Sequence, residues 1–168
     1  PGSLDGFRSR TGSGAGRLVS SAGVNFLGKR PLRAAQKASL RQALLLLLAD
    51  HACSASVNVC FVDDEEIRGL NRDYLGHDYV TDVVTFPMRS ERDGAEEDPL
   101  DDELLGEVVV SVDTARRYSE DRGTAFPREL SLYAIHGTLH LLGYDDAAPA
   151  DRRKMRRAER RYLDALES

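Results

Sequence analysis

Apolar and polar residues along this chain follow two different periods, one typical of helices and one typical of strands. In residues 31–52, apolar side chains recur close to helical spacing among strong helix formers, which predicts a long helix. Residues 56–63 instead alternate apolar and polar positions, as a half-buried strand does. Two further β runs, residues 82–86 and 106–112, predict two core strands, the first of them ended by Pro87.

Capping residues predict the helices that connect and follow these strands. Asp64 is expected to open a short helix with carboxylates in its first turn, where the helix dipole favours negative charge. Asp113 is expected to cap a second helix, which Gly123 ends. Pro127 is expected to open the next helix, because its missing N–H costs nothing in the first turn, and Gly143 to stop it.

The last predicted helix, residues 150–166, is highly charged and has only a narrow apolar stripe. Because helices and strands are interleaved without strict βαβ alternation, we predict an α+β fold in which helices cover a small mixed β-sheet. The longest apolar run, residues 43–49, falls far short of the roughly 20 residues that a membrane span needs. We therefore predict no membrane association.

The chain has 168 residues, of which 41% are hydrophobic, and this suits one domain with one core. Residues 1–18 lack an apolar signal core and are interpreted as a flexible tail or an expression remnant, which leaves residues 19–168 as the single domain. Two cysteines, Cys53 and Cys60, cannot form a disulfide framework. A reducing compartment is favoured, so we expect a cytoplasmic protein.

The formal net charge of −5 is unevenly distributed along the chain. Residues 61–107 carry 4 basic and 16 acidic side chains, whereas residues 151–168 carry 7 basic and 4 acidic ones. The acidic run 91–103 has no periodicity and is interpreted as a solvated loop. The arginines of residues 152–161 are dense enough to bind a phosphate backbone, although a solvated helix face explains them equally well. Binding of nucleic acid is thus permitted by the charge pattern but not demonstrated by it.

The strongest chemical signal is the string HGTLHLLGYDD, residues 136–146, at the end of a predicted helix. His136 and His140 share one helix face, about 40° apart around the axis and about 6 Å apart along it, so both imidazoles can reach one ion. Gly143 permits a left-handed turn that brings Asp146 back toward the same ion. Three protein ligands leave a fourth position for water, as in catalytic zinc sites.

Other interpretations of this motif are open. The two histidines could be partly buried, hydrogen-bonded residues without a ligand, but three candidate ligands and a turn residue rarely coincide by chance, which favours a metal. The ligand spacing also matches that of zinc proteases, which need a glutamate directly after the first histidine as general base; this chain has Gly137 there. Asp145 competes with Asp146 for the third ligand position.

The string resembles the H-G-x-L-H-L-x-G-Y-D-H signature of the YbeY family, bacterial endoribonucleases of ribosomal RNA maturation. The resemblance covers about residues 20–168 and includes three earlier motifs. These are residues 70–78 (LNRDYLGHD), residues 81–87 (TDVVTFP) and residues 105–111 (LGEVVVS).

The resemblance implies a metal-dependent endoribonuclease specific for single-stranded RNA, acting in 3′ processing of small-subunit ribosomal RNA and in ribosome quality control. It implies one Zn²⁺ ion, or another divalent transition metal, held by His136, His140 and Asp146. It also implies a ribosomal protein and a small GTPase as partners. We expect metal-bound water to be the catalytic group, its pKa lowered toward about 7, although attack by the RNA 2′-OH is equally compatible.

This chain departs from the family pattern at two positions that matter for the chemistry. The family's third histidine is Asp146 here, which lowers the effective charge of the ion and is expected to leave its water less acidic. The family's arginine after Tyr74 is Leu75 here, so a planar donor for a phosphoryl oxygen is missing. We hypothesise that Arg72 or His77 supplies this phosphate contact.

The resemblance also places Thr81, Asp82 and Ser111 near the site, where they are interpreted as supporting or substrate-contacting groups. Because Leu75 offers no donor, a second function stays open. It is a ribosome-associated RNA-binding module that keeps a structural metal and has weak or no cleavage. A metalloprotease is the third and least favoured function.

Overall fold

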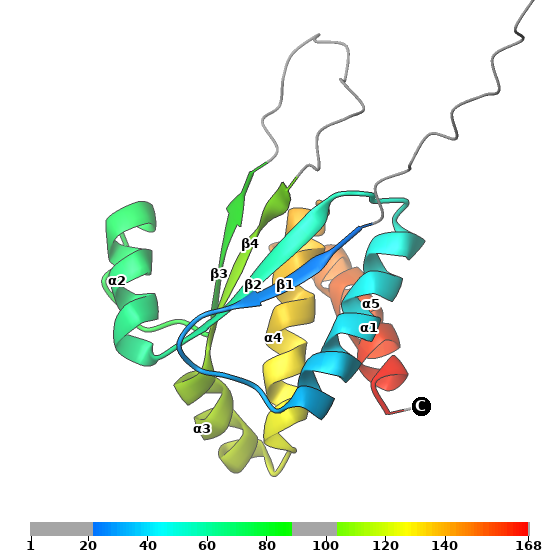
Figure 1. Cartoon of the computed structure of the whole chain (residues 1–168). Helices are drawn as coiled ribbons and strands as arrows, with labels where there is room; N and C mark the ends of the chain where they lie inside the picture. Colours follow the sequence, from blue (N-terminus) through cyan, green and yellow to red (C-terminus); the bar gives the residue numbers. More distant parts are fainter. Residues whose placement is uncertain (1–21, 89–103, 168) are drawn as a thin grey trace, which may run out of the picture.

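The computed structural model describes residues 22–88 and 104–167, so the predicted tail (1–18) and acidic run (91–103) lie outside the described residues. The described residues form four strands and five helices (Figure 1). The strands are β1 (Val24–Leu27), β2 (Ser56–Val62), β3 (Val83–Pro87) and β4 (Leu104–Ser111). The helices are α1 (Ala34–Asp50), α2 (Asp64–Leu75), α3 (Val112–Arg122), α4 (Phe126–Leu141) and α5 (Pro149–Ala165).

The sheet has the strand order β1-β2-β4-β3. β1, β2 and β4 run parallel, and β3 pairs antiparallel with β4. The predicted α+β fold with a small mixed sheet is therefore confirmed. β3 extends one residue further than predicted, through Pro87, which an edge strand tolerates because its outer side needs no donor.

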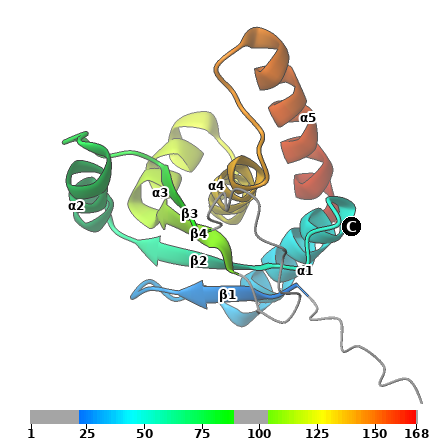
Figure 2. The same cartoon turned by 90° about the horizontal axis from the view of Figure 1, so that it is seen from above.

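Helices cover the two faces of the sheet unequally. The alternation predicted for β2 is confirmed, because Val57, Val59 and Phe61 are buried against the larger core, to which α1, α4 and α5 contribute. A smaller cluster around Ile67 of α2 covers the opposite face. Figure 1 shows α2 apart from the other helices, on the far side of the strands. Seen from above, α4 lies in the middle of the larger layer (Figure 2).

α4 packs close to the sheet because residue 137 has no side chain. A Cβ built on Gly137 would lie 2.4 Å from Cγ1 of Val108 in β4, which is inside contact distance. Burial extends to Leu130, Ile135 and Leu139, so the helix that ends in the histidine motif belongs to the core. The motif is therefore carried by one of the most firmly packed elements of the protein.

The structure corrects the start of α3 and adds one strand. The predicted cap Asp113 is wrong: Ser111 caps the helix, its hydroxyl accepting from the Thr114 N–H at 3.1 Å. β4 runs into α3 without a loop, so the cap lies two residues earlier than predicted. β1 was not predicted, because its four residues are too few to establish a period. None of the described helices has the length and apolar character required to cross a bilayer.

Candidate metal centre

His136 and His140 lie one turn apart in the last part of α4, and their Nε2 atoms are 3.0 Å apart. Each ring is held through its other nitrogen. Nδ1 of His140 donates to the carbonyl of Tyr144 at 2.9 Å, and Nδ1 of His136 lies 2.6 Å from a carboxylate oxygen of Glu159. Because both partners are acceptors, Nδ1 carries the proton in each ring, and in the neutral rings both Nε2 lone pairs face the same point.

The turn after α4 brings a carboxylate to these two nitrogens. Gly143 has a φ of +97°, a left-handed conformation that suits glycine, and its N–H donates to the carbonyl of His140 at 3.0 Å. Asp145 then accepts from the N–H groups of residues 146 and 147 at 2.7 and 3.1 Å. This turn places Oδ2 of Asp146 3.6 Å from Nε2 of His136 and 3.6 Å from Nε2 of His140.

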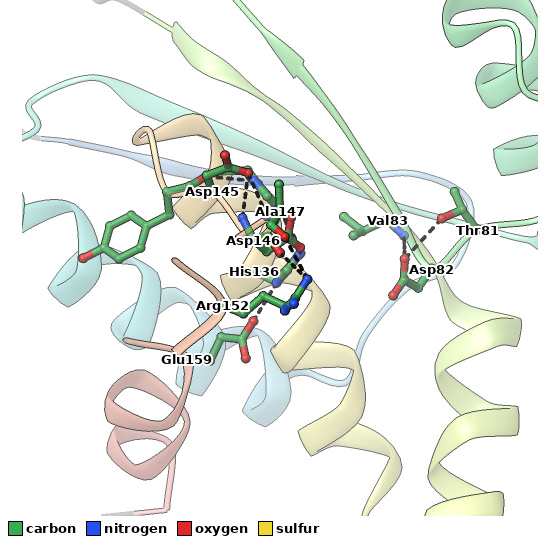
Figure 3. A network of polar contacts seen from close by, with 11 residues as sticks. Thr81, Asp82, Val83, His136, Asp145, Asp146, Ala147, Arg152 and Glu159 are labelled. Atoms are coloured by element: carbon green, nitrogen blue, oxygen red, sulfur yellow. Dashed lines mark hydrogen bonds and ion pairs between the residues drawn. The ribbon is translucent and has the colours of Figure 1, made fainter. Parts of the chain in front are cut away.

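The two adjacent aspartates thus do different things in the structure. Asp145 uses one oxygen to shape the turn, whereas Asp146 directs its carboxylate at the histidines (Figure 3). This arrangement favours Asp146 over Asp145 as the third member of the group. The two histidines and Asp146 have one ligand atom each within 4.8 Å of the others.

The donor set fits a divalent transition ion. Two imidazole nitrogens and one carboxylate oxygen are the ligand types of catalytic zinc sites. Ligands about 2.1 Å from a tetrahedral ion lie about 3.4 Å from each other. The separations in this group are 3.0, 3.6 and 3.6 Å, which bracket that value. His136, His140 and Asp146 could therefore hold one ion and leave a fourth position open.

Glu159 reaches the site from α5, 23 residues beyond His136. Its side chain is 15% exposed. Burial works against a charged imidazole, yet the hydrogen bond and the charge of Glu159 hold the pKa of His136 above its ordinary value. A carboxylate behind a histidine also fixes its ring and raises its basicity as a ligand.

The position of α5 depends on contacts with both α4 and α1 (Figure 2). Met155 and Tyr162 bury their side chains on the face that carries Glu159. Asp50, at the end of α1, accepts from the Tyr162 hydroxyl at 3.0 Å and from Arg161 at 2.9 Å. These contacts orient the helix that supplies Glu159.

A cleft of about 370 Å³ opens beside the group. Asp82, at the start of β3, lies across it from the turn that carries Asp146 (Figure 3). The carboxylate of Asp82 is fixed by the Val83 N–H at 2.8 Å and by the Thr81 hydroxyl at 3.2 Å. Six of the lining residues are Asp82, Arg122, Tyr133, His136, Arg152 and Arg156.

One side of the cleft is built around a buried carboxylate, Glu129. It accepts from Arg122 at 2.7 Å, from the Tyr133 hydroxyl at 2.9 Å and from Thr124 at 3.3 Å. Burial and the neighbouring Glu129 raise the pKa of Tyr133 far above its ordinary value, so this phenol stays protonated. Both lining residues of this cluster are therefore fixed in place.

The structure does not bring every predicted site residue to this cleft. Arg72 pairs with Asp73 at 2.9 Å, and the ring of His77 lies 5.4 Å from that of Tyr79; neither Arg72 nor His77 lines the cleft. Ser111 is fully buried, and its hydroxyl donates to the carboxylate of Asp64 at 2.6 Å. Of the predicted supporting residues, Asp82 lines the cleft, and the hydroxyl of Thr81 holds the carboxylate of Asp82 in place.

Sequence reasoning missed Glu159, and it did not connect Arg152 or Arg156 with the site. One signal for Glu159 was available: it is the single acid among residues 152–161, and it lies on the side of the helix that carries the apolar stripe. A lone carboxylate there needs a partner, and His136 is that partner.

Known proteins similar to this chain are found both by sequence and by structure. The family model described as Endoribonuclease YbeY matches residues 28–167. A protein named Endoribonuclease YbeY from Desulfitobacterium hafniense is 48% identical over 114 residues, 67% of this chain and 72% of that protein. One of the same name from Chlorobium phaeovibrioides is 41% identical over 135 residues, 80% and 84% of the two chains. The solution structure of TM1509 from Thermotoga maritima superimposes with a TM-score of 0.60 at 26% identity, covering 85% of this chain and 88% of that one.

Proposed function

Because the chain belongs to the YbeY endoribonuclease family, we propose that it is a metal-dependent endoribonuclease acting on single-stranded RNA in the maturation of small-subunit ribosomal RNA. One observation carries the proposal. Three acceptor atoms, from His136, His140 and Asp146, converge beside a cleft that arginines line. A cation at this point and cationic groups around it suit a substrate made of phosphodiesters.

The proposed ion is Zn²⁺, held by the same three residues. When bound, it supplies an acidified water and a positive charge next to the scissile phosphodiester. The protein's own groups position the ligands: Glu159 and the Tyr144 carbonyl fix the two rings, and Asp145 fixes the turn that carries Asp146. Asp82, the residue before β3, lines the cleft and can accept a hydrogen bond from the substrate there.

Residue 137 argues against a protease. A zinc protease places its general-base glutamate directly after the first histidine. That position is Gly137 here, and a Cβ there would lie 2.4 Å from Val108. The helix is pressed against the sheet at this point, so no side chain could extend from it into the cleft.

The roles proposed for Arg72 and His77 as phosphate contacts stay predictions, as does a function in ribosome quality control in the cytoplasm. A ribosomal protein and a small GTPase are the proposed partners. The second function, RNA binding with a structural metal and little cleavage, is favoured by one observation. The described residues that line the cleft include neither Leu75 nor the nearby cationic candidates Arg72 and His77.

Cleavage of single-stranded and duplex RNA by the purified, zinc-loaded chain tests the proposal. We expect cuts in the single strand that stop with a zinc chelator and are absent in His136→Ala and Asp146→Ala. Asp164→Ala, at an exposed carboxylate of α5 that does not line the cleft, is the control and should keep both zinc and cleavage. Zinc-dependent melting and RNA binding without any product would favour the second function instead. Cleavage that persists in both ligand variants would point to a contaminating nuclease and contradict the proposal.

A further inference from the structure

Two arginines of α5, Arg152 and Arg156, line the same cleft as the candidate metal ligands. They are four residues apart, so they lie on one face of the helix, about 6 Å apart along its axis. Met155 beside them is buried against the core and Glu159 is bound to His136, so this face of α5 is held in place. The two guanidinium groups therefore form a row along one wall of the cleft.

Arg152 is also tied to the turn that carries Asp146. Its Nη1 donates to the carbonyl of Ala147 at 2.8 Å and lies 3.4 Å from that of Asp146 (Figure 3). These contacts use one nitrogen of a group that has five N–H donors. Among the described residues, Arg152 and Arg156 have no acidic partner, whereas Arg161 of the same helix is paired with Asp50.

The charge of the cleft depends on these two residues. Three carboxylates face it, those of Asp82, Asp146 and Glu159, and Arg122 is already neutralised by Glu129. The three negative charges exceed the two positive charges of a divalent ion by one. The two arginines of α5 reverse the sign, and only a cleft of positive sign attracts a phosphodiester.

We propose that Arg152 and Arg156 form the phosphate-binding edge of this cleft and contact backbone phosphates of the single-stranded RNA on either side of the cut. This inference rests on the proposed function, because it takes RNA as the ligand. A row of cationic groups matches a chain of phosphates, and planar guanidinium groups bind phosphate oxygens with two parallel hydrogen bonds. Neither residue would read the base sequence.

The α5 helix offers a matched control. Arg153 and Arg157 have the same spacing and charge, are exposed, and do not line the cleft. Binding of a fluorescent single-stranded 2′-O-methyl RNA to zinc-loaded protein is measured across a salt series, and the oligonucleotide is checked afterwards to be uncut. Each phosphate contact contributes about 0.7 to the slope of log affinity against log salt. We expect Arg152→Ala/Arg156→Ala to lower the slope by about 1.4 and the affinity at low salt at least tenfold, and Arg153→Ala/Arg157→Ala to keep the wild-type slope.

Arg156→Ala alone, which breaks no hydrogen bond of the described residues, should lower the slope by about 0.7 and serves if the double variant misfolds. Equal slopes for Arg152→Ala/Arg156→Ala and the control variant Arg153→Ala/Arg157→Ala would overturn the inference. Cleavage by the zinc-loaded wild type is measured in parallel. If the wild type cuts RNA but the two double variants bind RNA with the same salt dependence, the phosphate-binding role of Arg152 and Arg156 is wrong and the proposed function stands. If the wild type does not cut RNA, but the slope of log affinity against log salt falls only in Arg152→Ala/Arg156→Ala, the phosphate-binding edge is supported and the nuclease proposal fails.

Discussion

The candidate metal centre and a second cluster, around Asp64, both gather charged groups, but only the second pairs each acceptor with a donor. Asp64 opens α2 and lies against the junction of β4 and α3. One of its oxygens accepts from the hydroxyls of Ser111 at 2.6 Å and Thr114 at 2.8 Å, and the other accepts from Arg117. At the end of α4, by contrast, two imidazole lone pairs and a carboxylate oxygen face one another with no donor between neutral rings.

This difference separates a structural cluster from a binding site. The Asp64 cluster is complete in itself, and its hydrogen bonds stabilise the ionised carboxylate enough to keep the pKa of Asp64 below its ordinary value despite partial burial. With both rings neutral, the metal centre is complete only with a cation, because its three acceptors then have no donor among them and repel one another. Either a metal ion or a proton on His136, whose pKa is raised, supplies that positive charge. Variants in the two clusters should therefore affect different measurements.

The largest expected effect is the loss of zinc from His140→Ala. Removing one of three protein ligands leaves only two, so we expect no stoichiometric zinc after dialysis and no cleavage. Metal content is measured by atomic emission on the purified protein. Asp64→Ala is the matched control and should retain one zinc per chain. Full zinc content in His140→Ala would contradict the assignment of the ligands.

Glu159→Ala should weaken zinc binding about 10- to 100-fold, because the carboxylate that fixes the ring of His136 is removed while all three ligands remain. Competition with a chromophoric chelator measures the affinity. Glu159→Gln keeps an acceptor oxygen for Nδ1 and should recover part of the loss. If both variants bind zinc as tightly as the wild type, Glu159 has no part in holding the ligand.

Asp64→Ala should lower the free energy of unfolding by about 2 kcal/mol, because two hydroxyls and a guanidinium lose a charged acceptor. Urea denaturation of the metal-free protein measures this loss. Asp73→Ala removes the exposed ion pair with Arg72 and should cost less than about 0.5 kcal/mol. Equal losses in the two variants would mean that the Asp64 cluster contributes no more than a surface pair.

The contribution of Asp64 should also depend on pH. The pKa of Asp64 is lower in the folded protein than its ordinary value of 3.8, so its contribution is complete above that value and is lost as the pH falls through the folded pKa. The stability difference between wild type and Asp64→Ala should be constant from pH 7 to about 4.5 and shrink below 3.8. If the stability difference already falls between pH 7 and pH 5, its pH dependence comes from a group other than Asp64.

The smallest effect is expected for Tyr144→Phe. The hydroxyl lies 2.9 Å from Nε2 of His51 and ties the turn after α4 to the end of α1, whereas the backbone carbonyl that accepts from His140 stays in place. We expect a loss of about 1 kcal/mol in stability and little change in zinc affinity. A large fall in zinc affinity would show that the tie to α1, and not the carbonyl alone, positions His140.

Much of the fold could be predicted because capping and turn residues mark most of the helices and because three of the strands have clear local patterns. Alternation along β2 and the β-branched residues of β3 and β4 were sufficient to locate these strands. The short β1 was missed, since it becomes a strand by pairing with β2 at the sheet edge. The start of α3 was misplaced because Ser111 serves both as the end of β4 and as a cap.

The sequence by itself determined that His136 and His140 share one face and meet a carboxylate just after the turn at Gly143, because helix geometry relates the histidines and the turn spans only a few residues. Such distances are set by bonds and local dihedral angles. The structure decided that this carboxylate belongs to Asp146 and not to Asp145. Only the tertiary structure decided that Glu159 lies behind His136, and that the arginines of α5 face the cleft. These contacts depend on how α5 packs against α4 and α1, and that packing is the combined result of many weak apolar contacts between segments far apart in the chain.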